Sequence, residues 1–136
     1  MFTLQKWIEW DMGHRVPGHH GACRNPHGHR YRATITVEGI PADDGMIVDF
    51  GIVKTLMMEE IHDRWDHAFL SWDEDHELVE TFDGKGWKFE TIQRPPTAEH
   101  LAQIIYNRIA ARLPDSLRLC RVDVRETPSS IGSYAG

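Results

Sequence analysis

The sequence has few of the features that mark a secreted, membrane-bound or nucleic-acid-binding protein. It contains only two cysteines in 136 residues, too few for the disulfide framework of a small secreted domain. No apolar run approaches the roughly 20 residues needed to cross a bilayer, and the first residues lack the apolar stretch and cleavage site of a secretory signal. We therefore expect a cytoplasmic protein with no membrane partner, folded as a single domain over residues 1–136.

Excess positive charge is also missing. The formal net charge is -6 at pH 7, which argues against a nucleic-acid partner. Positive charge is nevertheless concentrated around a histidine-rich stretch, where four arginines occur: Arg15, Arg24, Arg30 and Arg32. Such a local cluster predicts a small polyanion as partner.

The chain does contain three histidines on strand-like segments. Over residues 2–14, apolar side chains occupy mostly even positions, which is typical of a strand with one buried face. After a loop rich in glycine and proline over residues 15–26, alternation returns over residues 27–37. Antiparallel pairing of the two strands would bring three imidazoles to one end of the sheet: those of His14, His27 and His29. Three histidines with an open fourth position are typical of catalytic zinc, and histidines with purely structural hydrogen bonds are the alternative.

The loop between these strands holds a thiol. Cys23 lies among glycines and arginines, where nearby cations and a metal favour a reactive thiolate over a buried apolar filler. Cys120 lies on an alternating segment and is interpreted as a core residue. His19 and His20 are interpreted as exposed loop histidines, with a substrate contact as the alternative.

Two carboxylates also suggest chemistry. Asp66 precedes His67 at the end of a helical pattern, so the pair is either a helix cap or a carboxylate that orients an imidazole for proton transfer. Glu126 follows the core positions of a strand, and a buried carboxylate requires a partner. Ligand N–H groups, an arginine or a subunit boundary would each supply one.

The rest of the chain predicts an α+β domain. Strands are expected over 46–50 and 117–127 and in the 87–92 region, and helices over 53–65 and 97–113. The second helix begins after Thr97, a favourable N-cap, and residues 71–86 predict a short helix followed by a loop. This order favours an antiparallel sheet with helices covering one face.

Seven short motifs, spread in order over nearly the whole chain, together resemble the 6-pyruvoyl-tetrahydropterin synthase family. The resemblance is closest to its bacterial branch, the 6-carboxy-5,6,7,8-tetrahydropterin synthases of queuosine biosynthesis. The motifs are Gly13-His14, Gly18 to Cys23, His27-Gly28-His29, Gly45 to Phe50, Asp66 to Leu70, Pro96 to Glu99, and Glu126-Thr127-Pro128. The chain departs from the family pattern at Ser71 and His100, where asparagine is usual.

The resemblance implies the tunnelling fold (T-fold), with a four-stranded antiparallel sheet and two helices on one face of it. Three subunits would close a β-barrel, and two such trimers would form a homohexamer with active sites between subunits. It also implies Zn²⁺ on His14, His27 and His29, with Cys23 as the catalytic base.

For the remaining site residues, the resemblance implies a proton relay through Asp66 and His67 of a neighbouring subunit. It implies that Glu126 binds the pterin and that Thr97 and Glu99 line the pterin pocket. Glu99 would also suit a helix N-terminus for its dipole alone.

The reaction implied is conversion of 7,8-dihydroneopterin triphosphate to 6-carboxy-5,6,7,8-tetrahydropterin, with release of acetaldehyde and triphosphate. Some of the four arginines would bind the triphosphate. One alternative is a 6-pyruvoyl-tetrahydropterin synthase, which eliminates triphosphate and keeps the carbon skeleton; the three residues between Cys23 and His27 favour the carboxy-forming branch. A folate-pathway variant with glutamate as base is disfavoured by Cys23. The alternative of another class is a zinc-binding assembly module without catalysis.

Overall fold

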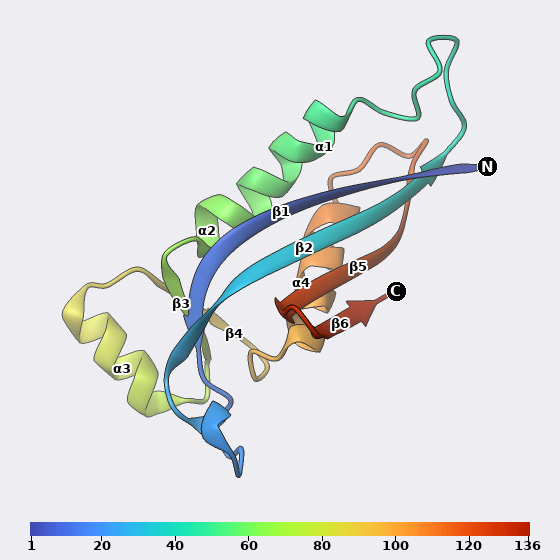
Figure 1. The fold of residues 1–136 in the computed structure, drawn as a ribbon. Coiled ribbons are helices and arrows are strands. Elements are labelled where there is room, and N and C mark those ends of the chain that lie inside the picture. Colours follow the sequence, from blue (N-terminus) through green and yellow to red (C-terminus); the bar gives the residue numbers. More distant parts are fainter.

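Two long strands organise the fold of this computed structural model, which describes residues 1–136. β1 (Phe2–His14) and β2 (His27–Gly39) pair antiparallel along their whole length, with Phe2 opposite Gly39 and His14 opposite His27 (Figure 1). Alternate side chains of both strands are buried, as their period-two patterns predict.

The sheet has six strands and is mixed, in the order β4-β3-β1-β2-β5-β6. On one side β5 (Arg118–Thr127) pairs antiparallel with β2, and β6 (Ser130–Tyr134) pairs antiparallel with β5. On the other side β3 (Ala68–Trp72) runs parallel to β1, and β4 (Phe89–Ile92) runs parallel to β3.

The expected four-stranded antiparallel sheet is therefore wrong. β3 pairs with only the last three residues of β1, and four of its five residues are buried, so its sequence carries no alternation. The turn after Thr127 returns the chain as β6, where the sequence pattern predicted only a tail.

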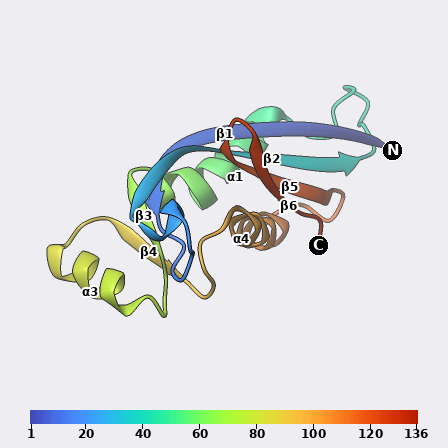
Figure 2. The same ribbon diagram turned by 60° about the horizontal axis from the view of Figure 1, so that its bottom comes forward.

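Three helical segments accompany the sheet, rather than two. α1 (Phe50–Met57) continues through a π-helical turn (Met58–His62) into α2 (Asp63–Trp65). α4 (Ala98–Ala110) lies on the same face of the sheet as α1, whereas α3 (His76–Lys85) lies beyond the β4 edge (Figure 2). None of the helices combines the length and apolar character needed to span a membrane.

Side-chain caps fix where the two long helices begin. The Asp49 carboxylate accepts a hydrogen bond from the Gly51 N–H at 2.6 Å, so residues 46–49 lead into α1 and the strand predicted over 46–50 is wrong. The Thr97 hydroxyl accepts from the His100 N–H at 3.4 Å, which confirms Thr97 as the cap of α4.

The core lies between the sheet and the helices. Trp10 of β1 stacks on Tyr31 of β2 with ring centroids 5.5 Å apart, and Trp65 of α2 packs against Trp10 at 6.0 Å. All three rings are fully buried. This cluster supports the end of the sheet where His14 and the other strand histidines lie.

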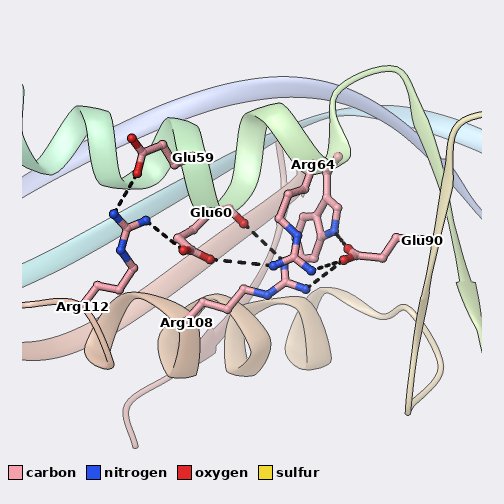
Figure 3. Close-up of polar contacts among 7 residues, drawn as sticks. Glu59, Glu60, Arg64, Glu90, Arg108 and Arg112 are labelled. Carbon is pink, nitrogen blue, oxygen red and sulfur yellow. Dashed lines mark hydrogen bonds and ion pairs between the residues drawn. The ribbon is translucent and has the colours of Figure 1, made fainter.

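A network of charged groups joins α1–α2 to α4 and β4 (Figure 3). Glu90 of β4 accepts hydrogen bonds from Arg64, from Arg108 at 3.2 Å and from the Trp65 indole N–H. Farther along the helices, Arg112 of the α4 C-terminal end pairs with Glu60 at 2.9 Å and Glu59 at 2.8 Å. The segment just before Asp66 is thus held from two sides.

Candidate metal centre

The structure brings the three strand histidines together. His14 and His27 are directly paired across β1 and β2, and His29 follows on the same face of β2. Their ligand nitrogens all lie within 4.8 Å of one another, and the Nε2 atoms of His14 and His27 are 3.1 Å apart. The convergence follows from strand alternation, as the sequence predicts.

Main-chain carbonyls fix the tautomers of two of these rings. The Nδ1–H of His14 donates to the Pro96 carbonyl at 2.8 Å, and the Nδ1–H of His27 donates to the Asn25 carbonyl at 2.7 Å. Because a carbonyl only accepts, each neutral ring presents an unprotonated Nε2 to the other. Two lone pairs at this distance repel unless a cation lies between them.

The environment keeps the histidines in the form that metals bind. Burial lowers the pKa of His14, outweighing the hydrogen bond to Pro96 and the nearby Glu126 carboxylate. Burial likewise lowers the pKa of His29, whose buried Nε2 has no hydrogen-bond partner. Three convergent imidazoles, two of them held through Nδ1 by main-chain carbonyls, fit a zinc ion.

A carboxylate adjoins this cluster. Oε1 of Glu126, near the end of β5, lies 3.3 Å from His14 Nε2 and 3.7 Å from His29 Nε2. The side chain is 24% exposed, and no arginine or lysine pairs with it. Of the three partners considered for Glu126 from the sequence, no arginine of the chain pairs with it, so ligand N–H groups and a subunit boundary remain.

Cys23 lies on a short 3₁₀ turn (Ala22–Arg24) in the loop between β1 and β2. Its carbonyl accepts from the Val16 N–H at 2.8 Å, which closes the loop. The residue lines a cavity of about 430 Å³ together with Thr97, Glu99 and Glu126. The sequence-predicted thiol and pterin-pocket residues therefore share one cavity.

His19 is an exposed loop residue, as the sequence predicts, and it also lines this cavity, which is consistent with the alternative of a substrate contact. Its Nδ1 accepts from the Gly21 N–H at 2.8 Å, so its Nε2–H is available to a ligand. Only the loop conformation places it there, and no period in the sequence signals it.

Asp66 and His67 form a hydrogen-bonded pair. Asp66 Oδ2 accepts from the His67 Nδ1–H at 2.7 Å, and its Oδ1 accepts from the Asp11 N–H at 3.0 Å. Burial acts to raise the pKa of Asp66, but these hydrogen bonds and the nearby imidazoles lower it below its usual value. The carboxylate therefore stays charged and orients His67, whose side chain is 77% exposed.

A second imidazole approaches the same carboxylate. His62 Nε2 lies 3.7 Å from Asp66 Oδ2, and His62 is the last residue of the π-helical turn. The two residues are four apart, which is the spacing of neighbours on a helix surface, and the Asp66 N–H donates to the His62 carbonyl at 2.8 Å.

Within one chain, His67 does not share the cavity of Cys23. His67 lines a separate surface hollow of about 430 Å³ with Asp11, Arg30 and His29. The two hollows lie on either side of the histidine cluster, and both are open at the surface of the chain. A relay that joined Cys23 to His67 would therefore need a second copy.

The four arginines considered as triphosphate ligands have different surroundings. Arg15 makes a two-bond ion pair with Asp75 at 2.8 and 2.6 Å, and Arg32 lies over the Trp7 ring at 3.8 Å and pairs with Glu9. Arg30 pairs with the exposed Asp11 at 3.1 Å. Arg24 has no carboxylate partner, so it and Arg30 are better placed for a phosphate than Arg15 and Arg32.

Comparisons with known proteins agree with this geometry. The sequence profile described as "6-pyruvoyl tetrahydropterin synthase" matches residues 3–136. The 6-carboxy-5,6,7,8-tetrahydropterin synthase of Rickettsia bellii is 33% identical over 133 residues, covering 95% of this chain and 96% of the relative. The enzyme of that name from Haemophilus influenzae is 32% identical over 147 residues, covering 98% and 99%.

Solved structures show the same fold. Caenorhabditis elegans 6-pyruvoyl tetrahydropterin synthase superposes with a TM-score of 0.75 at 24% identity, covering 99% of this chain and 95% of that one. Uncharacterized protein WS1659 of Wolinella succinogenes superposes with a TM-score of 0.85 at 20% identity, covering 99% and 98%.

Proposed function

The chain belongs to the 6-pyruvoyl tetrahydropterin synthase family, and from this premise we propose that it is a zinc-dependent lyase of the 6-carboxy-5,6,7,8-tetrahydropterin synthase type. Its substrate is 7,8-dihydroneopterin triphosphate, and its products are 6-carboxy-5,6,7,8-tetrahydropterin, acetaldehyde and triphosphate, within queuosine biosynthesis. The observation that carries the proposal is the cavity that Cys23 shares with Glu126, whose carboxylate adjoins the cluster of three convergent histidines.

His14, His27 and His29 would hold the zinc. When bound, zinc supplies Lewis acidity, which makes ionisation of nearby hydroxyl groups feasible at neutral pH. The carbonyls of Asn25 and Pro96 keep Nε2 of two of these histidines free for this role.

Cys23 is the base in this proposal. Its place on the wall of the cavity allows the thiolate to accept a proton from the substrate side chain. Glu126 accepts hydrogen bonds from the pterin ring N–H and amino group, which turns the side chain of the substrate toward Cys23. Thr97 and Glu99 line the same wall and orient the ring.

His67, held by its hydrogen bond to Asp66, returns the proton from a neighbouring subunit. This part of the proposal is supported by the exposure of His67 and by its separation from the Cys23 cavity in one chain. We propose the homohexamer of two stacked trimers as the assembly that completes the site.

The test is product analysis after incubation of the zinc-loaded protein with 7,8-dihydroneopterin triphosphate. Mass spectrometry should find 6-carboxytetrahydropterin and an equal amount of acetaldehyde. Triphosphate release without acetaldehyde would instead identify a 6-pyruvoyl-tetrahydropterin synthase. Stoichiometric zinc with no turnover of any dihydropterin would favour the non-catalytic assembly module.

A further inference from the structure

We propose that Glu126 is a fourth, exchangeable ligand of the metal. Its carboxylate binds the metal while the pterin pocket is empty and leaves it when a pterin enters. The inference rests on the zinc site of the proposed function. It adds a pterin-free state of that site, in which Glu126 is the fourth metal ligand.

The spacing of the ligand atoms supports direct coordination. A tetrahedral zinc with ligands at about 2.0–2.1 Å separates neighbouring ligand atoms by about 3.3–3.4 Å. His14 Nε2 lies 3.1 Å from His27 Nε2 and 3.3 Å from Glu126 Oε1. The carboxylate oxygen is also 3.7 Å from His29 Nε2, so it stands near the position that three histidines leave open.

The hydrogen-bonding roles of these atoms support the same reading. His14 donates its Nδ1–H to Pro96, so its neutral ring turns a lone pair toward Glu126. A carboxylate oxygen and an imidazole lone pair at 3.3 Å repel, and Glu126 has no arginine or lysine to compensate its charge. A metal ion bound by both atoms would remove the repulsion.

The backbone around Glu126 allows the side chain to be re-aimed. The pairing of β5 with β6 shifts register between Arg125 and Thr127, and Glu126 is the extra residue at this irregularity. Such bulges commonly redirect a side chain next to a site. Glu126 also lines the cavity of Cys23, so the carboxylate has a second position available on the pterin side.

The two roles of Glu126 exclude each other. The adjacent ring N–H and amino group of a pterin engage both oxygens of one carboxylate, so Oε1 cannot stay directed at the metal while Glu126 makes both hydrogen bonds. Pterin binding would therefore free one metal coordination position at the moment when the substrate side chain arrives.

Cobalt(II) in place of zinc tests the proposal, because its visible absorption reports the ligands and their number. The probe is unsubstituted 7,8-dihydropterin, which lacks the side-chain hydroxyls that could bind the metal themselves. We expect dihydropterin to change the Co²⁺ spectrum of the unaltered protein. We also expect Glu126→Gln to change the spectrum without pterin and to weaken Co²⁺ and Zn²⁺ binding by about 10–100-fold.

Glu99→Gln is the matched control, because Glu99 lines the same cavity without contacting the histidines. Its Co²⁺ spectrum and metal affinity should equal those of the unaltered protein. Equal spectra and affinities for Glu126→Gln and the unaltered protein would overturn the proposal. So would a spectrum of the unaltered protein that saturating dihydropterin leaves unchanged.

The proposed function can fail separately. A spectrum that responds to dihydropterin, in a protein that turns over no dihydropterin triphosphate, would support the ligand exchange and contradict the lyase. Turnover of dihydropterin triphosphate by a protein whose Co²⁺ spectrum does not respond to dihydropterin would support the lyase and contradict the ligand exchange. A protein that binds neither ion would overturn both the zinc site and the exchange.

Discussion

Two of the three histidines of the candidate metal centre, His14 and His27, are oriented by main-chain carbonyls rather than by carboxylates. Asn25 is part of the loop that carries Cys23, so the orientation of His27 depends on the conformation of that loop. The loop therefore sets both the ring that faces the metal and the thiol beside it, although the thiol itself is proposed as a base and not as a ligand.

Replacement of Cys23 distinguishes a thiol that acts as a base from a thiol that binds the metal. Cys23→Ala should lower turnover by about 10²–10⁴-fold, because proton transfer loses its base, while zinc content stays at one per chain. Turnover is measured by product formation and zinc by atomic emission. Cys120→Ala, a change at the other half-buried cysteine, should alter neither quantity. Loss of zinc from Cys23→Ala would make the thiol a ligand instead.

Acid should destabilise the metal-free protein in a defined range. His14 and His29 have lowered pKa values when folded, so between those values and about 6.5 the unfolded chain binds more protons. The stabilisation is complete above about 6.5 and is lost as pH falls toward the lowered values. Urea midpoints of chelator-treated protein at pH 7.5, 6.5 and 5.5 should fall in that order. A His29→Gln variant should show a smaller slope, and an equal slope would contradict the assignment.

Strand alternation was sufficient to predict that His14, His27 and His29 converge and that Glu126 turns toward them. It was wrong for Cys120, which is only half-buried, because a register shift between Thr36 and Val37 lets both Leu119 and Val122 face the core. It was silent about His19, since the conformation of a loop positions this side chain. Local periodicity carries no information about such contacts.

At the scale of elements, the charge network around Glu90 connects two helices and the β4 edge (Figure 3). Arg108 is mostly covered and also lies 5.0 Å from the Trp65 ring centroid. Loss of the Glu90 charge would leave this guanidinium without its principal partner. The same loss would loosen Trp65, which directly precedes Asp66.

We expect Glu90→Gln to lower the free energy of unfolding by about 1–3 kcal/mol, less than for a fully buried pair because solvent screens part of the network. Urea unfolding measures the change. Glu59→Gln removes the same charge from an exposed pair with Arg112 and should have little measurable effect. Equal effects of the two changes would show that burial of the Glu90 cluster does not determine its contribution.

The elements that were predicted correctly are those with long periodic patterns or clear caps, such as β1, β2 and α4. β3 and β6 were missed because each has only five residues and follows another element directly. Residues 46–50 contain β-branched side chains that favour a strand, but Asp49 caps the helix that follows. The cap decides the local structure, so the predicted strand does not form. β3 is brought parallel to β1 by the helical segment α1–α2 that precedes it in the chain. This long-range pairing produces no pattern in the sequence of β3 itself.

At the scale of the whole molecule, Cys23 and His67 open onto different sides of the histidine cluster. If each complete site combines the two residues from different chains, then Cys23→Ala and His67→Ala should each be inactive alone. Co-expression of the two variants should restore about a quarter of the sites by random mixing. Product formation per zinc measures the recovery.

The control is co-expression of Cys23→Ala with Glu126→Gln. These residues line one cavity of one chain, so mixing should restore no complete site. An absence of recovery for Cys23→Ala with His67→Ala, with mixed assemblies confirmed by native mass spectrometry, would mean that the two residues do not act in one shared site.

All three histidines of the candidate metal centre belong to the first hairpin of the chain, whereas the Pro96 carbonyl and the Glu126 carboxylate emerge from the ribosome much later. A nascent chain that has just completed β2 therefore already carries the three imidazoles. A one-residue slip of β1 against β2 would turn His14 to the opposite face and separate it from His27. A metal captured during synthesis would thus favour the correct strand register before the helices exist to enforce it.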